Sequence, residues 1–228
     1  MFPEHIIPFD ASVYDFPSIV QRIFDVENLQ QLHALHDIQS QITFDEDTKT
    51  WFHKKYYTSE FYPEMVALYN RFVKEQILPL YRPDTEFAVQ IEPSFRVQLP
   101  NNTALGSTNS DEKVGLHCDA DYNHQPGEIN FIVPITPMFG TNSVFVESEP
   151  NLGDYHSVNI PIGSAFCFYG NKCRHYNVRN DTGLSRVSID FRIIPMSKYI
   201  SDWDSVSVHG KRPLKLGGYF NKINADHT

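Results

Sequence analysis

The apolar positions of this chain change their period at about residue 84. Between residues 65 and 80 they recur at every third or fourth position, which places them on one side of an α-helix. Pro63 and Pro79 stand near the two ends of this stretch, where a helix tolerates proline. The pattern predicts an earlier helical stretch over 16–36 with a break near Asn28, and the acidic residues from Asp45 onward suit the start of another helix.

After residue 84 apolar residues alternate with polar ones in short runs that are separated by Gly, Pro and Asn. This period of two predicts β-strands in an antiparallel sandwich or barrel. The expected strands cover residues 87–99, 128–135, 143–146, 164–169, 175–179 and 185–194. Residues 180–183, Asn-Asp-Thr-Gly, are typical of a tight turn, so we expect the last two strands to be antiparallel neighbours.

The alternation in the last strand separates two kinds of side chain. One face carries Val187, Ile189, Phe191 and Ile193. The other carries Arg186, Ser188, Asp190 and Arg192. The common cause of such alternation is a sheet with one solvated face. The alternative is a barrel with a polar cavity inside and helices covering its apolar outer face. We favour the cavity, because His175 and Asn177 also share one face of their strand.

The composition supports a folded protein that acts on small molecules. With 228 residues, 41% of them hydrophobic, the chain can bury a full core, and we expect a single domain over 1–228. Within it we expect a helical part over 1–83, a β core over 84–195 and a C-terminal extension over 196–228. The net charge of −9 and the lack of a basic run argue against nucleic acid as a partner, because phosphate binding relies on clustered Lys and Arg.

The sequence shows neither a secretory signal nor an apolar run long enough to span a membrane. Its three cysteines, Cys118, Cys167 and Cys173, lack the spacing of a zinc or redox motif. We therefore expect reduced thiols in a cytoplasmic protein. The oligomeric state stays open.

The residues with the most chemical content are His117 and Asp119. Two positions apart on a strand, their side chains would lie on the same face. A third ligand, His175, would complete a set of two histidines and one carboxylate, which suits non-haem Fe(II) and leaves coordination positions open. His33, His36 and Asp37 have the spacing of a zinc site on a helix, but such clusters are usually solvated. We expect His53, His156 and His209 to be structural.

The order of these residues resembles that of a known enzyme family. The evidence lies in LHCDADYNHQPGEINFIVPIT over 116–136 and TNSVFVESEPNLGDYHSVNIPIGSAFCFYGNKCRHYNVRNDTGLSRVSIDFRIIP over 141–195. These stretches resemble the core of Fe(II)/2-oxoglutarate-dependent oxygenases, and are most similar to the small bacterial oxygenases of the streptomycin-biosynthesis type. The resemblance implies a mainly β fold with N-terminal helices, namely a double-stranded β-helix of the cupin-like jelly-roll kind.

The resemblance also implies roles for individual residues. His117, Asp119 and His175 would hold Fe(II). Arg186, eleven residues after His175 and with Ser188 beside it, would bind the C5 carboxylate of the cosubstrate 2-oxoglutarate, since a guanidinium offers a planar fork. With O2, such an enzyme oxidises its substrate and releases succinate and CO2. Halogenating relatives lack the carboxylate ligand, so Asp119 argues for hydroxylation or a related oxidation such as desaturation.

A second group of polar residues is expected to face the same interior. Asn130 and Gln98 would contact the cosubstrate or the substrate. Substrate contacts are expected from Arg96, Asn142, Glu147 and Asp121. A carboxylate such as that of Glu147 would bind an ammonium group, so we expect a small polar substrate such as an amino acid or an amine-bearing natural-product intermediate. The loop over 100–115 has the position of a lid.

Two other functions fit part of this pattern. A cupin-like metal-dependent isomerase or dioxygenase that does not use 2-oxoglutarate would keep the metal ligands but would not need Arg186. In a non-catalytic jelly-roll binding module the histidines would be structural. Neither alternative predicts succinate formation that depends on Fe(II) and 2-oxoglutarate.

Overall fold

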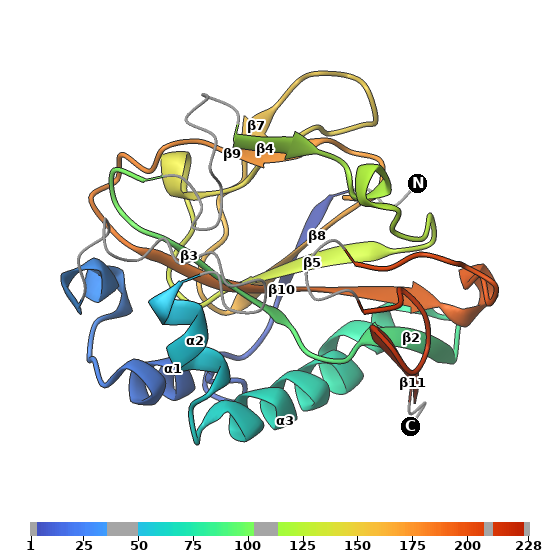
Figure 1. The fold of residues 1–228 in the computed structure, drawn as a ribbon, viewed down its shortest axis with the longest axis horizontal. Helices are drawn as coiled ribbons and strands as arrows, with labels where there is room; N and C mark the ends of the chain where they lie inside the picture. Colours follow the sequence, from blue (N-terminus) through green and yellow to red (C-terminus); the bar gives the residue numbers. More distant parts are fainter. Residues whose placement is uncertain (1–3, 36–49, 103–113, 208–211, 226–228) are drawn as a thin grey trace.

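The chain folds into two antiparallel β-sheets and a layer of helices, as a computed structural model shows (Figure 1). The structure describes residues 4–35, 50–102, 114–207 and 212–225. The fold is mainly β, as predicted. No helix within these ranges is long and apolar enough to cross a membrane.

The large sheet has seven strands, and β10 lies at its centre. Its order is β1 (His5–Pro8), β8 (Ser164–Phe168), β5 (Ile129–Pro134), β10 (Arg186–Pro195), β2 (Glu86–Gln90) and β11 (Phe220–Asn224), with β3 (Ser94–Gln98) also paired to β10. The small sheet has the order β4 (Val114–His117), β9 (His175–Asn177), β6 (Phe145–Val146) and β7 (His156–Ser157). Apolar residues of both sheets, among them Ile132, Val146 and Phe166, form one buried cluster, so the two sheets pack face to face. Short 3-10 turns cover Asp119–Tyr122, Gly140–Asn142 and Met196–Lys198.

The helices cover the outer face of the large sheet, away from the small sheet (Figure 1). They are α1 (Phe16–Phe24), the 3-10 segment Leu29–Leu35, α2 (Trp51–Tyr57) and α3 (Tyr62–Phe72). A π turn over Val73–Ile77 and a 3-10 turn over Leu78–Tyr81 continue α3. The helix α1 begins where Asp15 accepts a hydrogen bond from the Ser18 amide (3.1 Å), and it ends at Asp25, whose φ of 57° is left-handed.

The two faces of β10 differ as the alternation predicts. Val187 and Phe191 belong to the core shared with the helices, where Phe191 stacks on Phe131 with ring centroids 4.9 Å apart. On the opposite face, Arg186 and Arg192 are only 4% and 9% exposed. The solvated alternative for this face is therefore wrong: its charged residues are turned to the interior of the protein.

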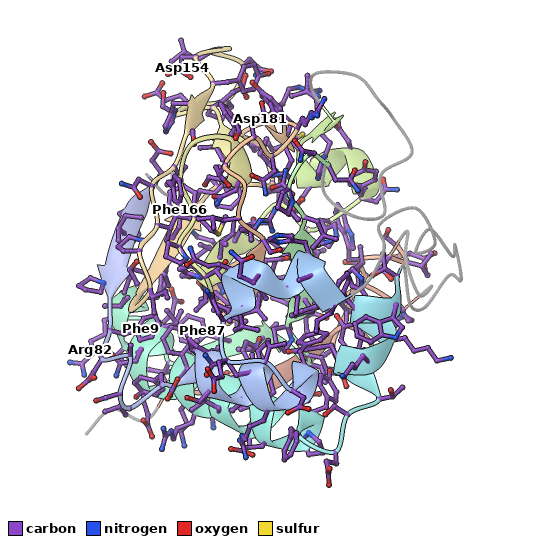
Figure 2. The ribbon with its side chains drawn as sticks, turned by 90° about the vertical axis from the view of Figure 1, so that its left-hand side faces the viewer. Phe9, Arg82, Phe87, Asp154, Phe166 and Asp181 are labelled. Atoms are coloured by element: carbon purple, nitrogen blue, oxygen red, sulfur yellow. The ribbon has the colours of Figure 1, made fainter. Side chains whose placement is uncertain are left out.

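Side chains of both sheets and of the helices extend into the space between the layers (Figure 2). Phe166 lies between the sheets, while Arg82 and Phe87 lie toward the helical end and Asp154 at the far end by the small sheet. The two sheets and the helices therefore form one continuous stack of layers, and the polar residues of β10 lie within it.

Two expectations about strands are wrong, and three strands were not expected. The run 87–99 forms two strands, β2 and β3, because residues 91–93 leave the sheet at Pro93. The segment 180–183 is no hairpin: β9 belongs to the small sheet and β10 to the large one, so the chain crosses between sheets. Buried Asn180 holds this crossover, because its side-chain amide donates to Leu184 O (2.7 Å). The strands β1, β7 and β11 were not expected.

The helix predictions were closer to the structure. Both the helix over 65–80 and the break in 16–36 are present, although α3 starts a few residues earlier. The expected helix start near Asp45 lies outside the described residues, and the helix α2 itself begins at Trp51. Most of the loop over 100–115 also lies outside them.

Candidate metal centre

The predicted ligands come together at one end of the small sheet. His117 is the last residue of β4, and His175 is the first of β9 and lies directly across from it. Asp119 does not continue the strand as expected, because the chain turns into a 3-10 segment where the Asp119 amide donates to Gly170 O (2.8 Å). The expected shared face of a strand is therefore replaced by a strand end followed by a tight turn.

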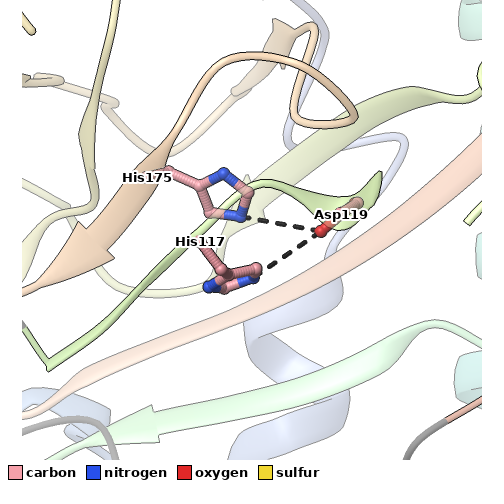
Figure 3. Close-up of side chains that lie close together, drawn as sticks. All are labelled: His117, Asp119 and His175. Atoms are coloured by element: carbon pink, nitrogen blue, oxygen red, sulfur yellow. Dashed lines mark ion pairs between the residues drawn. The ribbon is translucent and has the colours of Figure 1, made fainter. Parts of the chain in front are cut away.

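The ligand atoms face one another (Figure 3). The Nε2 atoms of His117 and His175 each lie 3.7 Å from Oδ1 of Asp119, and all three ligand atoms lie within 4.8 Å of one another. This is the only group of three or more His, Cys, Asp or Glu side chains with such an arrangement in the described parts of the chain. Two imidazoles and one carboxylate are the donor set that suits Fe(II), so the residues fit that ion.

Backbone carbonyls orient both imidazoles. His117 Nδ1 contacts Gly115 O, and His175 Nδ1 contacts Cys173 O at 3.1 Å. A carbonyl oxygen can only accept, so each Nδ1 carries the proton and each Nε2 keeps its lone pair for a metal. Burial lowers the pKa of His175 to about 4, so this imidazole is neutral at pH 7.

Asp119 is 1% exposed and uses its two oxygens differently. While Oδ1 faces the histidines, Oδ2 accepts hydrogen bonds from Asn130 Nδ2 (2.6 Å) and Arg192 Nε (2.8 Å). Burial alone would raise the pKa of Asp119, but the Arg192 guanidinium and the neighbouring hydrogen bonds bring it well below its usual value. The Asp119 side chain is therefore deprotonated and can act as an anionic ligand to a cation.

Arg186 lies on the same inner face of β10 and is almost fully buried. Its guanidinium donates to Asn142 O (3.2 Å), Ser188 Oγ (3.1 Å) and Gln98 Oε1 (3.4 Å). No carboxylate pairs with it among the residues that the structure describes. Burial lowers the pKa of Arg186 to about 10, so the side chain stays cationic at pH 7. Arg186, Ser188 and Gln98 thus form the polar group that the sequence predicts.

The other predicted residues have protein partners. Arg96 forms a bidentate ion pair with Asp190 (2.5 and 3.3 Å). Glu147 accepts from the backbone amides of Arg174 (2.7 Å) and Gly153 (3.0 Å), so it holds a loop.

Two more predicted residues cap turns. The Asn142 side chain accepts from the Phe139 amide (2.7 Å). Asp121 accepts from the Cys118 amide (3.1 Å) and lies 3.3 Å from Arg174 Nη1. Asp121 is therefore near the ligands, although its carboxylate is engaged within the protein.

Sequence reasoning missed the residues behind Asp119. Arg192 contacts Asp119 and lies 3.5 Å from Glu128, whose carboxylate in turn lies 2.7 Å from His124 Nδ1. The parity of β10 placed Arg192 on the inner face beside Arg186, so that signal was present in the sequence. Only the fold shows that Arg192 reaches the Asp119 carboxylate.

Three histidines outside the site have ordinary contacts with neighbouring protein groups. His33 bonds Ser185 Oγ through its ring and its amide, and His53 contacts Thr50 Oγ1 (2.8 Å). His156 pairs with Glu4 (2.9 Å). The remaining partners of the possible zinc face, residues 36 and 37, and the histidine at 209 lie outside the described residues.

Comparison with known proteins identifies the family. No family model matches the chain. The streptomycin biosynthesis protein StrG of Streptomyces griseus is 30% identical over 217 residues, which cover 94% of this chain and 96% of StrG. This chain belongs to the StrG family. The predicted relation to streptomycin-biosynthesis proteins is thereby confirmed, although the name of StrG specifies no reaction.

Solved structures share the fold of this StrG relative. EctD from S. alaskensis with 2-oxoglutarate and 5-hydroxyectoine has a TM-score of 0.53 at 11% identity, covering 94% of this chain and 76% of EctD. EctD with bound Fe has a TM-score of 0.52 at 12% identity, covering 87% and 74%. The StrG relative therefore has the fold of proteins that carry iron and 2-oxoglutarate, and it contains a His-Asp-His group that could hold a metal.

Proposed function

We propose that this protein is a non-haem Fe(II)- and 2-oxoglutarate-dependent oxygenase. The observation that carries the proposal is the convergence of His117, Asp119 and His175, with both Nε2 atoms directed at one carboxylate oxygen. Fe(II), when bound, would couple the decarboxylation of 2-oxoglutarate by O2 to oxidation of the substrate, releasing succinate and CO2. The protein contributes binding, orientation and shielding from water.

Arg186 is proposed to bind the C5 carboxylate of 2-oxoglutarate. Support comes from its burial together with the absence of an anionic partner in the described part of the chain. A buried cation is costly unless an anion neutralises it, and a planar guanidinium binds a carboxylate with two parallel hydrogen bonds. A metal-dependent isomerase without a 2-oxoacid would have no need for this cation.

Neighbouring polar groups are proposed to complete the cosubstrate site. The Ser188 hydroxyl accepts from the Arg186 guanidinium and keeps its own proton to donate to the incoming carboxylate, while Gln98 Oε1 orients the guanidinium by accepting from it. Asn130 Oδ1 is buried without a hydrogen-bond partner, and it is proposed to accept from a donor group of the substrate, because 2-oxoglutarate itself carries only acceptors.

We further propose that the two sheets form a double-stranded β-helix and that residues 1–228 are one domain. The crossover from β9 to β10 supports the first proposal, because it joins strands of facing sheets. Packing of the N-terminal helices on the large sheet supports the second.

The proposed substrate is a small polar metabolite, such as an amino acid or an amine-bearing natural-product intermediate, and the proposed oxidation is hydroxylation. Relatedness to a protein of streptomycin biosynthesis supports a natural-product role. Arg96 and Asp121, whose side chains are 42% and 43% exposed, are the charged candidates for substrate contact. The carboxylate ligand Asp119 favours hydroxylation over halogenation.

Succinate formation tests the proposal. The protein is incubated with Fe(II), 2-oxoglutarate, O2 and a panel of amines and amino acids, and succinate and oxidised products are measured by mass spectrometry. We expect succinate only when both Fe(II) and 2-oxoglutarate are present, and more of it with a true substrate. Asp119→Ala, which removes one ligand, should abolish it. Full turnover by Asp119→Ala, or no succinate from the wild type under any condition, would exclude the proposed reaction.

A further inference from the structure

We propose that Arg192 and Asn130 form a clamp that reserves a single oxygen of Asp119 for the metal. The clamp is a positioning device: neither residue is a metal ligand, and both act through Asp119. The inference rests on the proposed metal site and adds which residues hold Asp119 in the orientation that presents one oxygen.

The contacts of Asp119 Oδ2 are the first support for the clamp. Asn130 Nδ2 and Arg192 Nε donate to this oxygen at 2.6 and 2.8 Å, while Oδ1 receives neither of these bonds and faces the histidines. Hydrogen bonds to a carboxylate are about twice as strong as bonds between neutral groups. Releasing Oδ2 toward a metal would break both in a buried environment.

Both donors are themselves fixed. The Arg192 guanidinium donates to Tyr219 Oη (3.2 Å) and lies 3.5 Å from the buried Glu128 carboxylate. Asn130 is held by the backbone of Gly170: a Cβ on that glycine would lie 2.7 Å from Asn130 Cγ. The clamp is therefore rigid, and Asp119 has to adapt to it.

Carboxylate orientation decides how many positions of the metal remain free. A facial set of three single-atom ligands leaves three positions of an octahedral ion, enough for a 2-oxoacid chelate and for O2. If Asp119 turned and bound through both oxygens, one of these positions would be lost. Arg192 and Asn130 would thus keep the site open for both cosubstrates.

An arginine suits this task better than a lysine. Its planar guanidinium can direct Nε at Asp119 while Nη1 donates to Tyr219. Arg192→Lys keeps the charge but cannot reproduce both bonds, whereas Arg192→Met removes the charge as well. The two variants separate the contribution of geometry from that of charge.

The test measures metal binding by the apoprotein. Mn(II) titration gives the dissociation constant, and water proton relaxation gives the number of exchangeable waters on the bound ion. We expect three waters in the wild type and two in Arg192→Met, with affinity weakened roughly 10- to 100-fold, as for other groups that orient metal ligands. Arg192→Lys should fall between them. Arg22→Met, which removes an arginine of the exposed pair with Glu64, is the matched control and should behave as the wild type.

Asn130→Ala provides a second test if Arg192→Met does not fold, because it removes the other donor to Asp119 without removing a charge. It should also lose one exchangeable water. Folded variants of both positions that bind Mn(II) within threefold of the wild type and keep three waters would overturn the clamp. If instead the wild type binds no Mn(II), or Asp119→Ala binds it equally well, the metal site itself is refuted. The two failures are therefore distinguishable.

Discussion

Replacing Arg186 by methionine separates a cosubstrate role from a structural one. In the folded apoprotein Arg186 is a buried cation whose bonds go to Asn142 O, Ser188 Oγ and Gln98 Oε1. Methionine has a similar length, removes the charge and fills most of the same space. The change should weaken 2-oxoglutarate binding strongly while leaving the apoprotein folded.

Two opposing effects set the stability of Arg186→Met. Burial lowers the pKa of Arg186 to about 10, which corresponds to a cost of about 3 kcal/mol for keeping the cation inside the apoprotein. Removing the guanidinium relieves that cost but leaves three buried acceptors without their donor. Each lost hydrogen bond destabilises the folded apoprotein by about 1 kcal/mol or more. The two nearly cancel, so we expect the melting temperature of the apoprotein to change by only a few degrees.

For the binding of 2-oxoglutarate, no second effect offsets the loss of the guanidinium. Truncating one member of a buried, hydrogen-bonded charge pair costs about 2–5 kcal/mol, or roughly 30- to 5,000-fold in dissociation constant. Calorimetric titration with Mn(II) present measures this loss, and Arg186→Lys should be weakened less than Arg186→Met. The exposed Arg212, which lies 3.3 Å from Glu92, supplies a control in Arg212→Met. If Arg186→Met binds 2-oxoglutarate within threefold of the wild type, the assignment of Arg186 is wrong.

Three further predictions concern the surroundings of the site and the core. Gly170→Ala should weaken Mn(II) binding at least several-fold, because the new Cβ displaces Asn130 from Asp119; unchanged affinity in a titration would contradict this. Burial raises the pKa of Cys167 to about 11, so its stabilising contribution is complete below pH 9 and is lost as the pH rises toward 11. Between pH 9 and pH 11 the free energy of unfolding, measured with urea, should fall by up to about 3 kcal/mol more in the wild type than in Cys167→Ala. An equal fall in both proteins would refute this prediction. Asn180→Ala should lower the free energy of unfolding by about 1–3 kcal/mol; a smaller loss would mean that the crossover does not depend on its side-chain bonds.

Local patterns predicted the features that depend on one segment. The alternation of β10 gave its buried apolar face and its polar inner face, because side-chain direction follows directly from the period of a strand. The helix over 65–80 was equally accessible from its spacing. The ligand set came from residue types and their order along the chain.

Features that depend on pairing between distant segments could not be read in the same way. The chain does turn at 180–183, as its sequence indicates. The sheet that β10 joins, however, is decided by its pairing with β5, β2 and β3. The strand β11 has only Phe220 fully buried, so it carries almost no alternation. The contact of Arg192 with Asp119 likewise depends on the tertiary fold and could not be predicted from the sequence.

The decisive measurement for the proposed metal and cosubstrate site is a crystal structure of the protein with Fe(II) and 2-oxoglutarate, grown without oxygen. We expect an anomalous iron peak bound by Nε2 of His117, Nε2 of His175 and Oδ1 of Asp119. We also expect 2-oxoglutarate with its C5 carboxylate on the Arg186 guanidinium. Iron at any other site, or 2-oxoglutarate bound away from Arg186, would contradict the proposed site.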